Sequence, residues 1–131
     1  MLRCILVTPE RTVRDESADF VAMTLFDGEI GIACGHAPLI GRLGYGEMRI
    51  KRGDDTIHYY IEGGFVEVVD DVVSVLTGRA ILPQDIDDAV VAEQLRSAQA
   101  KPATTPELMA LRDRAVAQSR GQLLVARRAG A

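Results

Sequence analysis

The residue types best suited to chemistry gather in one stretch, DGEIGIACGHAPLIGRLGYG, which runs from Asp27 to Gly46 and contains Cys34, His36 and six glycines. A phosphate-binding loop of the type GxxxxGK needs a lysine after its last glycine, and this stretch has no lysine. A dinucleotide-binding GxGxxG turn leads into a helix, and the pattern that follows here is not helical. The stretch therefore fits neither type of nucleotide site.

Cys34 and His36 are also poor candidates for a metal site or a nucleophilic pair. A closed zinc shell needs further ligands, yet the only other histidine, His58, falls in a separate predicted strand. A cysteine and histidine pair needs a third group to orient the histidine, and none is evident. We therefore predict no catalytic residue, no metal site and no cofactor. A small hydrolase that uses His36 is the least favoured alternative.

The glycines and the proline of this stretch suit a rigid loop instead. Glycine allows positive φ and tight turns, while Pro38 stiffens the loop and keeps Ala37 extended. Loops held by a rigid scaffold often carry recognition residues. We therefore interpret the polar groups Glu29 and His36 as candidate recognition residues.

Length and composition limit the protein to one sizeable core, or to a compact domain with a small appendage. The chain has 131 residues, of which 47% are hydrophobic and 26% are charged. No apolar run approaches the roughly 20 residues that a membrane-spanning helix needs. The N-terminus lacks the cleavage site of a secretory signal, so we expect a cytoplasmic protein.

Charge disfavours a nucleic-acid-binding protein, and cysteine content disfavours a zinc-binding or disulfide-stabilised one. The net charge is −4, and no arginine or lysine cluster is interleaved with aromatic residues, so nucleic-acid binding is disfavoured. Cys4 and Cys34 lack CxxC spacing, which argues against a zinc site and against a disulfide scaffold. Both cysteines are predicted to be small buried hydrophobic residues.

From Met1 to about Ile81 the chain reads as short strands separated by glycine and aspartate. Apolar and polar residues alternate, β-branched residues are frequent, and turn residues recur at intervals of about ten positions. This pattern predicts an antiparallel sandwich or barrel. The sequence RGDD suits a hairpin loop, and the segment Val69–Val72 suits a two-residue turn.

Alternation in the segment TIHYYIEGG divides its side chains between two faces of one strand. One face holds Ile57, Tyr59 and Ile61, and the other holds His58, Tyr60 and Glu62. We therefore interpret His58 as an exposed strand residue rather than a ligand.

After LPQ the pattern changes to that of two helices. The first is predicted to begin near Asp85. Its residues at helical spacing are Ile86, Ala89, Val90, Glu93 and Ala100. KPATTPE interrupts this helix, with Thr105 as a candidate N-cap and Pro106 at the first position of the second helix. We expect an antiparallel hairpin, and a division into a sandwich docking domain, residues 1–84, and a two-helix domain, residues 85–131.

The predicted hairpin is marginally stable. Apolar residues of its second helix are Leu108, Leu111 and Ala115, and the seam with the alanines of the first helix is narrow. Such a seam contributes only a few kcal/mol. Gly121, inside the second helix, lowers its stability by a further ~1 kcal/mol relative to alanine.

The end of the chain is basic. From Pro106 onward five arginines stand against Glu107 and Asp113, a net charge of +3, which leaves −7 for the rest of the chain. These arginines are Arg112, Arg114, Arg120, Arg127 and Arg128. A basic tail on an acidic body indicates contact with an acidic segment, within the chain or on a partner. A solvated helix face is the alternative.

Two segments together resemble the epsilon subunit of F-type ATP synthases. They are GEIGIACGHAPLIGRLGYGEMRI and IEGGFVEVVDDVVSVLTGRAILPQDID, which are similar to the family pattern G-E-x-G-I-x-x-x-H-A-P-L, followed by G-G-F-x-E-V and V-x-V-L. The resemblance covers nearly the whole chain, and its motifs are specific in the first two thirds. It implies a sandwich of about ten antiparallel strands followed by a C-terminal helical hairpin, which agrees with the pattern of the residues.

The resemblance also implies a function and partners. The implied function is that of a non-catalytic rotor subunit in the central stalk of a proton-translocating ATP synthase, peripheral to the cytoplasmic face of the bacterial inner membrane. The implied partners are the gamma subunit and the c-ring. The residues implied to face them are Glu29, His36, Ala37, Pro38, Leu39 and Ile40. The glycine-rich stretch would then be a docking surface.

Family members fold the two helices against the sandwich or extend them to inhibit ATP hydrolysis, and the five arginines would then meet acidic segments of the catalytic head. Some members bind ATP through a motif of the form I/L-D-x-x-R-A. Here Ile86 and Asp87 match it and Val90 replaces the arginine, which disfavours ATP binding. The alternative function is a free-standing β-sandwich module that binds a ligand or peptide.

Overall fold

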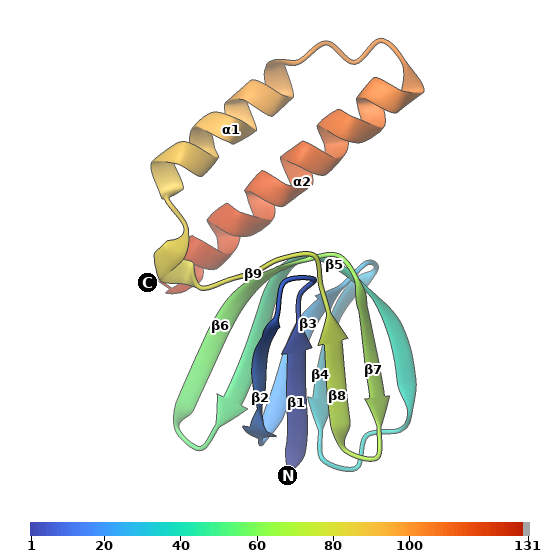
Figure 1. Cartoon of the computed structure of the whole chain (residues 1–131). Coiled ribbons are helices and arrows are strands. Elements are labelled where there is room, and N and C mark those ends of the chain that lie inside the picture. Colours follow the sequence, from blue (N-terminus) through green and yellow to red (C-terminus); the bar gives the residue numbers. More distant parts are fainter. Residues whose placement is uncertain (130–131) are drawn as a thin grey trace.

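The structure, a computed structural model, describes residues 1–129 and contains nine strands followed by two helices (Figure 1). The strands are β1 (Leu2–Val7), β2 (Thr12–Ala18), β3 (Phe20–Leu25), β4 (Gly28–Ala33), β5 (Leu39–Arg52), β6 (Asp55–Glu62), β7 (Phe65–Val69), β8 (Val72–Leu76) and β9 (Ala80–Ile81). A 3-10 turn, η1 (Pro83–Asp85), leads to the helices α1 (Asp88–Ala100) and α2 (Pro106–Ala129). Within residues 1–129 no helix has the length and apolar character to span a bilayer.

The strands form two facing sheets, as predicted, and β5 belongs to both of them. Sheet A has the order β2-β1-β8-β7-β5, and sheet B has the order β4-β3-β5-β6-β9. In β5, residues 39–42 pair with β7 and residues 45–52 pair with β6. The described strands number nine, and one pair, β1 with β8, is parallel. Alternation cannot reveal that pair, because it fixes the faces of a strand and not its neighbours.

The inward faces of the two sheets form one hydrophobic core, which includes Leu2, Cys4, Leu6, Val21, Met23, Ile32, Met48, Ile50, Val66, Val68, Val73 and Val75. The two predicted turns are confirmed. Gly53 has a φ of 60° in the RGDD hairpin, and Asp70 and Asp71 have φ values of 50° and 63° between β7 and β8. These turns fix the register of the strands on either side.

Strand β6 has the two faces that alternation predicts. Ile57, Tyr59 and Ile61 pack in or against the core. The opposite face is not open to solvent, because α2 lies against β6 and Tyr60 is fully buried. His58 is half-buried, and its Nδ1 lies 3.4 Å from Glu47 Oε2. The prediction that His58 is an exposed strand residue is therefore wrong.

The caps of the helices are set by short side chains. Helix α1 begins at Asp88 rather than near Asp85, because extended Asp87 accepts hydrogen bonds from the N–H groups of Ala89 and Val90 at 3.1 and 3.2 Å. Thr105 caps α2 as predicted, because its hydroxyl oxygen accepts from the N–H of Leu108 at 3.1 Å.

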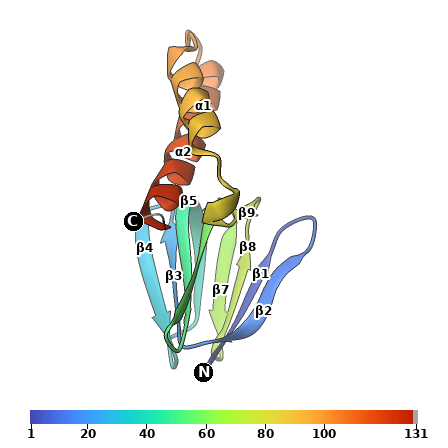
Figure 2. The ribbon, with the colours of Figure 1, turned by 90° about the vertical axis from the view of Figure 1, so that its left-hand side faces the viewer.

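The prediction of which apolar residues the hairpin buries is wrong. Val90, Leu108 and Leu111 are exposed. The buried apolar side chains are instead Val91, Ala98, Leu123 and Val125, and the polar side chains of Ser119 and Gln122 are buried with them. The hairpin stands on the sandwich by the C-terminal half of α2 and projects away from it (Figure 2). The outer part of α2 therefore has no sheet to pack against.

Candidate docking surfaces

Loop 34–38 connects β4 of sheet B to β5 and contains much of the docking surface predicted from the sequence. The N–H of His36 donates to the main-chain oxygen of Ala33 at 3.2 Å, and its Nδ1 lies 2.7 Å from the main-chain oxygen of Ala37. Ala37 and Pro38 are exposed. Leu39 packs against the core, whereas Ile40 turns outward.

Glu29 does not lie with His36. Glu29 pairs with Thr24 near the start of β4, whereas His36 follows the end of that strand. The Glu29 carboxylate binds Arg49 at 2.8 Å. The structure therefore divides the predicted surface into two parts at opposite ends of β4.

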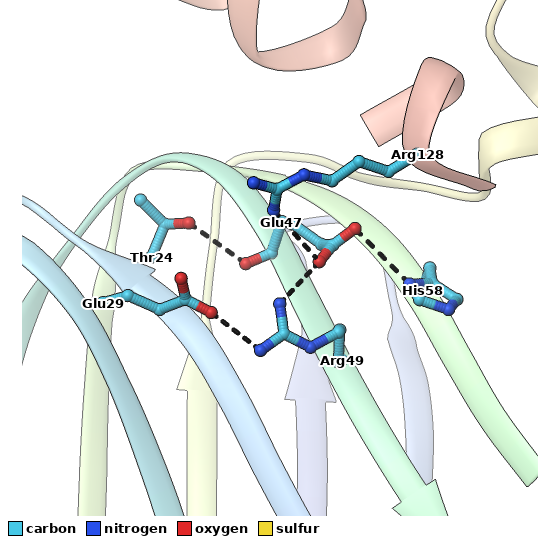
Figure 3. A network of polar contacts seen from close by, with 6 residues as sticks. All are labelled: Thr24, Glu29, Glu47, Arg49, His58 and Arg128. Carbon is cyan, nitrogen blue, oxygen red and sulfur yellow. Dashed lines mark hydrogen bonds and ion pairs between the residues drawn. The ribbon is translucent and has the colours of Figure 1, made fainter. Parts of the chain in front are cut away.

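The outer face of sheet B holds a network of charged side chains centred on Glu47 (Figure 3). Glu47 is only 5% exposed, and its Oε1 lies 2.7 Å from Arg49 Nη1 and 3.7 Å from Arg128 Nη1 of α2. With His58, three side chains that carry or can carry a positive charge face one buried carboxylate. The sequence patterns did not predict this network, although alternation alone places Glu47 and Arg49 on one face of β5.

Beside this network, the backbone of α2 lies close to the sandwich at Gly121. A Cβ at this position would lie 3.0 Å from Tyr60 Cε1 and 3.1 Å from the main-chain oxygen of Tyr45. The glycine that weakens the helix therefore allows it to dock. Burial raises the pKa of Tyr60, whose hydroxyl donates to Glu62 at 2.9 Å.

The five arginines of the tail have different surroundings in this conformation. Arg112 lies 3.4 Å from the neighbouring Asp113, and Arg128 reaches Glu47. Arg114, Arg120 and Arg127 are exposed on α2. Part of the predicted contact between the basic tail and an acidic group is thus made within the chain.

The residues that match the ATP motif have structural roles. Asp87 caps α1, and Ile86 is half-buried after η1. Val90, which stands in place of the arginine, is exposed. A cap is sufficient to explain Asp87, because its carboxylate accepts from two N–H groups of the helix.

The two cysteines differ from each other. Cys4 is buried as predicted, and burial raises the pKa of its thiol to about 12. Cys34 is exposed, so the prediction of a buried residue is wrong for it; its thiol donates to Asp71 Oδ2 at 3.2 Å. In the part of the chain that the structure describes, no group of three or more His, Cys, Asp and Glu residues could hold a metal ion.

The outer face of sheet A carries large apolar side chains in contact with solvent. We define Ile40, Phe65 and Leu76 as the outer apolar patch; they are 76%, 60% and 54% exposed. Phe65 pairs with Leu76 across β7 and β8, and with Arg42, two residues after Ile40, across β7 and β5. Of these three residues, only Ile40 was predicted from the sequence to lie on a docking surface. Alternation in FVEVV could have placed Phe65 outward, because Val66 and Val68 must face the core.

The protein is a two-sheet β-sandwich with exposed apolar side chains on one outer face and a helical hairpin docked on one end. The family model described as ATP synthase, Delta/Epsilon chain, beta-sandwich domain, matches residues 1–83. The chain belongs to this family of ATP synthase delta and epsilon chains. The resemblance read from the sequence is therefore confirmed.

Individual relatives match over almost the whole chain. The ATP synthase epsilon chain of Rhodopirellula baltica is 48% identical over 126 residues, which are 96% of this chain and 98% of the relative. A chain in the Euglena gracilis mitochondrial ATP synthase OSCP/F1/c-ring structure has a TM-score of 0.83 at 22% identity, covering 98% of this chain and 80% of that chain. A chain in the Tetrahymena thermophila mitochondrial ATP synthase central stalk/c-ring structure has a TM-score of 0.71 at 14% identity, covering 95% and 96%. These two structures show that the fold is shared.

Proposed function

We propose that this chain is a non-catalytic rotor subunit in the central stalk of a proton-translocating F-type ATP synthase, where it joins a gamma subunit to the c-ring and couples both to the catalytic head. Its family, its 48% identity to a relative named ATP synthase epsilon chain, and the fold it shares with a chain of a central stalk/c-ring structure support this proposal. Such a subunit is peripheral to the cytoplasmic face of the bacterial inner membrane, held there by its partners.

The observation that carries the proposal is the outer apolar patch. Its side chains are more than half exposed, although the inner face of the same sheet already closes the core. Phe65 and Leu76 are direct cross-strand neighbours, and Ile40 lies diagonally from Phe65, next to Glu67 and Arg42. Exposed apolar side chains that cluster within a polar rim often mark protein contacts. The patch is continuous with loop 34–38, since Pro38 lies two residues before Ile40. We assign both to the gamma subunit.

Glu29 suits a different partner. It lies with Arg49 on the side of the sandwich formed by sheet B, whereas the patch lies on the outer face of sheet A. A charged edge is complementary to polar loops rather than to an apolar surface. We therefore assign Glu29 to the polar loops of the c-ring, so that gamma and the c-ring occupy separate surfaces of one sandwich.

Phe65→Ser is expected to weaken binding to the gamma subunit by about tenfold or more, because an aromatic anchor at the centre of an interface often contributes ~2 kcal/mol or more. Calorimetric titration of the chain with the gamma subunit of the same organism measures the effect. Val69→Ser is the matched control, since Val69 is exposed on the same face of β7. An unchanged affinity of Phe65→Ser would contradict the assigned surface, and equal losses in both variants would contradict the role of Phe65 as its anchor. No complex between the wild-type proteins would favour a free-standing binding module.

The hairpin is proposed to be a second domain that inhibits ATP hydrolysis when it leaves the sandwich. The family model ends at residue 83, and η1 at Pro83–Asp85 separates the last strand from α1, which supports the division into residues 1–84 and 85–131. Arg114, Arg120 and Arg127 are exposed on α2. Together with Arg112 and Arg128, they would bind acidic segments of the catalytic head.

Removal of the residues after Pro102 is expected to raise ATP hydrolysis by the assembled complex about fivefold or more, within the range of ordinary allosteric coupling. The measurement is the steady-state ATPase rate of complexes that contain equal amounts of either chain. A full-length control that carries Arg114→Gln, Arg120→Gln and Arg127→Gln separates the effect of the positive charges from that of removing the helices themselves. An unchanged rate in the shortened complex would refute the inhibitory role and leave the stalk assignment standing.

A further inference from the structure

The turn between β7 and β8 has an unusual backbone for its residue types. Asp70 and Asp71 both have positive φ, at 50° and 63°, in a two-residue turn closed by the pair Val69 and Val72. Glycine, asparagine and aspartate are the residues that adopt such φ values with little strain. Backbone geometry therefore explains why this turn accepts aspartate, but not why an acid stands at position 71.

The contacts of the Asp71 side chain supply a reason. Its Oδ1 accepts a hydrogen bond from the N–H of Gly35 at 2.7 Å, and its Oδ2 accepts from the thiol of Cys34 at 3.2 Å. Its main-chain oxygen accepts from the N–H of Arg3 at 2.8 Å, which anchors the turn to β1. The carboxylate thus ties loop 34–38, which leads from one sheet to the other, to a turn held within sheet A.

The ionised carboxylate is the form that these donors favour. The N–H of Gly35, followed by the thiol of Cys34, holds the pKa of Asp71 below its ordinary value. Gly35 itself has a φ of 84°, a conformation in which the loop turns sharply just before His36. The hydrogen bond from the N–H of Gly35 to Asp71 therefore lies at the residue whose backbone turns the loop.

We infer that Asp71 is a positioning residue for loop 34–38: its carboxylate fixes the shape in which His36, Ala37 and Pro38 are presented to the gamma subunit. The partner in this inference rests on the proposed function, whereas the contact between Asp71 and the loop does not. A loop that is already ordered loses less conformational entropy on binding, so the carboxylate strengthens docking without touching the partner.

Asp71→Ala and Asp70→Ala form a matched pair that tests the inference. Both place alanine at a positive φ in the same turn, so their backbone strain is similar, and only Asp71→Ala removes the bonds to Cys34 and Gly35. Asp71→Asn keeps an oxygen that can accept from Gly35 and tolerates the backbone of the turn. Thermal unfolding of each variant checks that it folds.

The first measurement is amide hydrogen exchange at Gly35, followed by NMR in the isolated chain. Asp71→Ala is expected to speed this exchange about tenfold or more relative to Asp70→Ala, the range for loss of one hydrogen bond to a charged group. Asp71→Asn is expected to restore most of the protection. Equal exchange rates in the two alanine variants would overturn the inference.

The second measurement is affinity for the purified gamma subunit. Asp71→Ala is expected to bind about threefold or more weakly than Asp70→Ala, in line with the cost of ordering a loop on binding, and Asp71→Asn is expected to recover. Faster exchange at Gly35 without any difference in affinity would overturn the positioning role. If the wild-type chain binds no gamma subunit, the proposed function fails, while exchange at Gly35 still decides whether Asp71 orders the loop.

Discussion

Gly121→Leu is expected to release the hairpin from the sandwich. Leucine forms helices better than glycine, which favours the variant by up to ~1 kcal/mol. Against this gain, the first side-chain atom would already lie 3.0 Å from Tyr60 and 3.1 Å from the main-chain oxygen of Tyr45. Tyr45 belongs to a paired strand that cannot move aside, and overpacking costs about 1 to 3 kcal/mol or more. We therefore expect the cost of overpacking to exceed the gain in helix propensity, so that the population of docked hairpin falls.

Hydrogen exchange of the amides in α2 measures this release. An isolated helix pair with a narrow seam is marginal, so α2 is expected to lose about tenfold or more of its protection once it leaves the sandwich. Ala110→Leu is the control, because Ala110 is exposed on the outer half of the same helix. Protection of Leu123 and Val125 at wild-type levels in Gly121→Leu would show that the close approach does not restrict docking.

Glu47→Ala is expected to destabilise the folded chain by about 2 to 3 kcal/mol. Breaking a buried ion pair by removal of one partner costs ~3 to 5 kcal/mol, because the other charge is left without compensation. Here Arg49 is one-third exposed and keeps its bond to Glu29, so the loss lies at or below the lower end of that range. Removal of the carboxylate also leaves His58 and Arg128 without their acidic partner.

Unfolding in urea measures the change in stability. Glu67→Ala is the matched control, because Glu67 is an exposed glutamate in a strand, and such surface changes stay within about 0.5 kcal/mol. Arg128→Ala is also expected to have a small effect, because its side chain is half exposed and its contact with Glu47 is 3.7 Å long. Equal stability of the Glu47 and Glu67 variants would mean that the network contributes nothing measurable.

The parts of the fold that were predicted correctly depend on residues close together in the sequence. The turn at Asp70 and Asp71 and the cap at Thr105 each involve neighbours within three or four positions. The faces of β6 follow from alternation alone. Such signals fix strands, turns and helix starts, because the physical interactions behind them are local.

The parts that were not predicted depend on contacts between distant segments. Glu47 is buried because α2 covers it, more than seventy positions later in the chain. Helix propensity alone makes Gly121 a defect, and only the nearby Tyr45 and Tyr60 show why it is needed. Cys34 was predicted to be buried from its residue type, but it follows the last residue of a strand and is exposed there.

The single strand shared by the two sheets has a mechanical consequence. In a sandwich held together only by side chains, a sideways push on one layer can slide it past the other, because dispersion contacts have little preferred direction. Here β5 continues from one layer into the next without interruption. Shear between the two sheets must therefore stretch or bend the covalent backbone of β5. A displacement imposed on the outer face of sheet A, where Phe65 lies, is thus transmitted to sheet B, which α2 contacts.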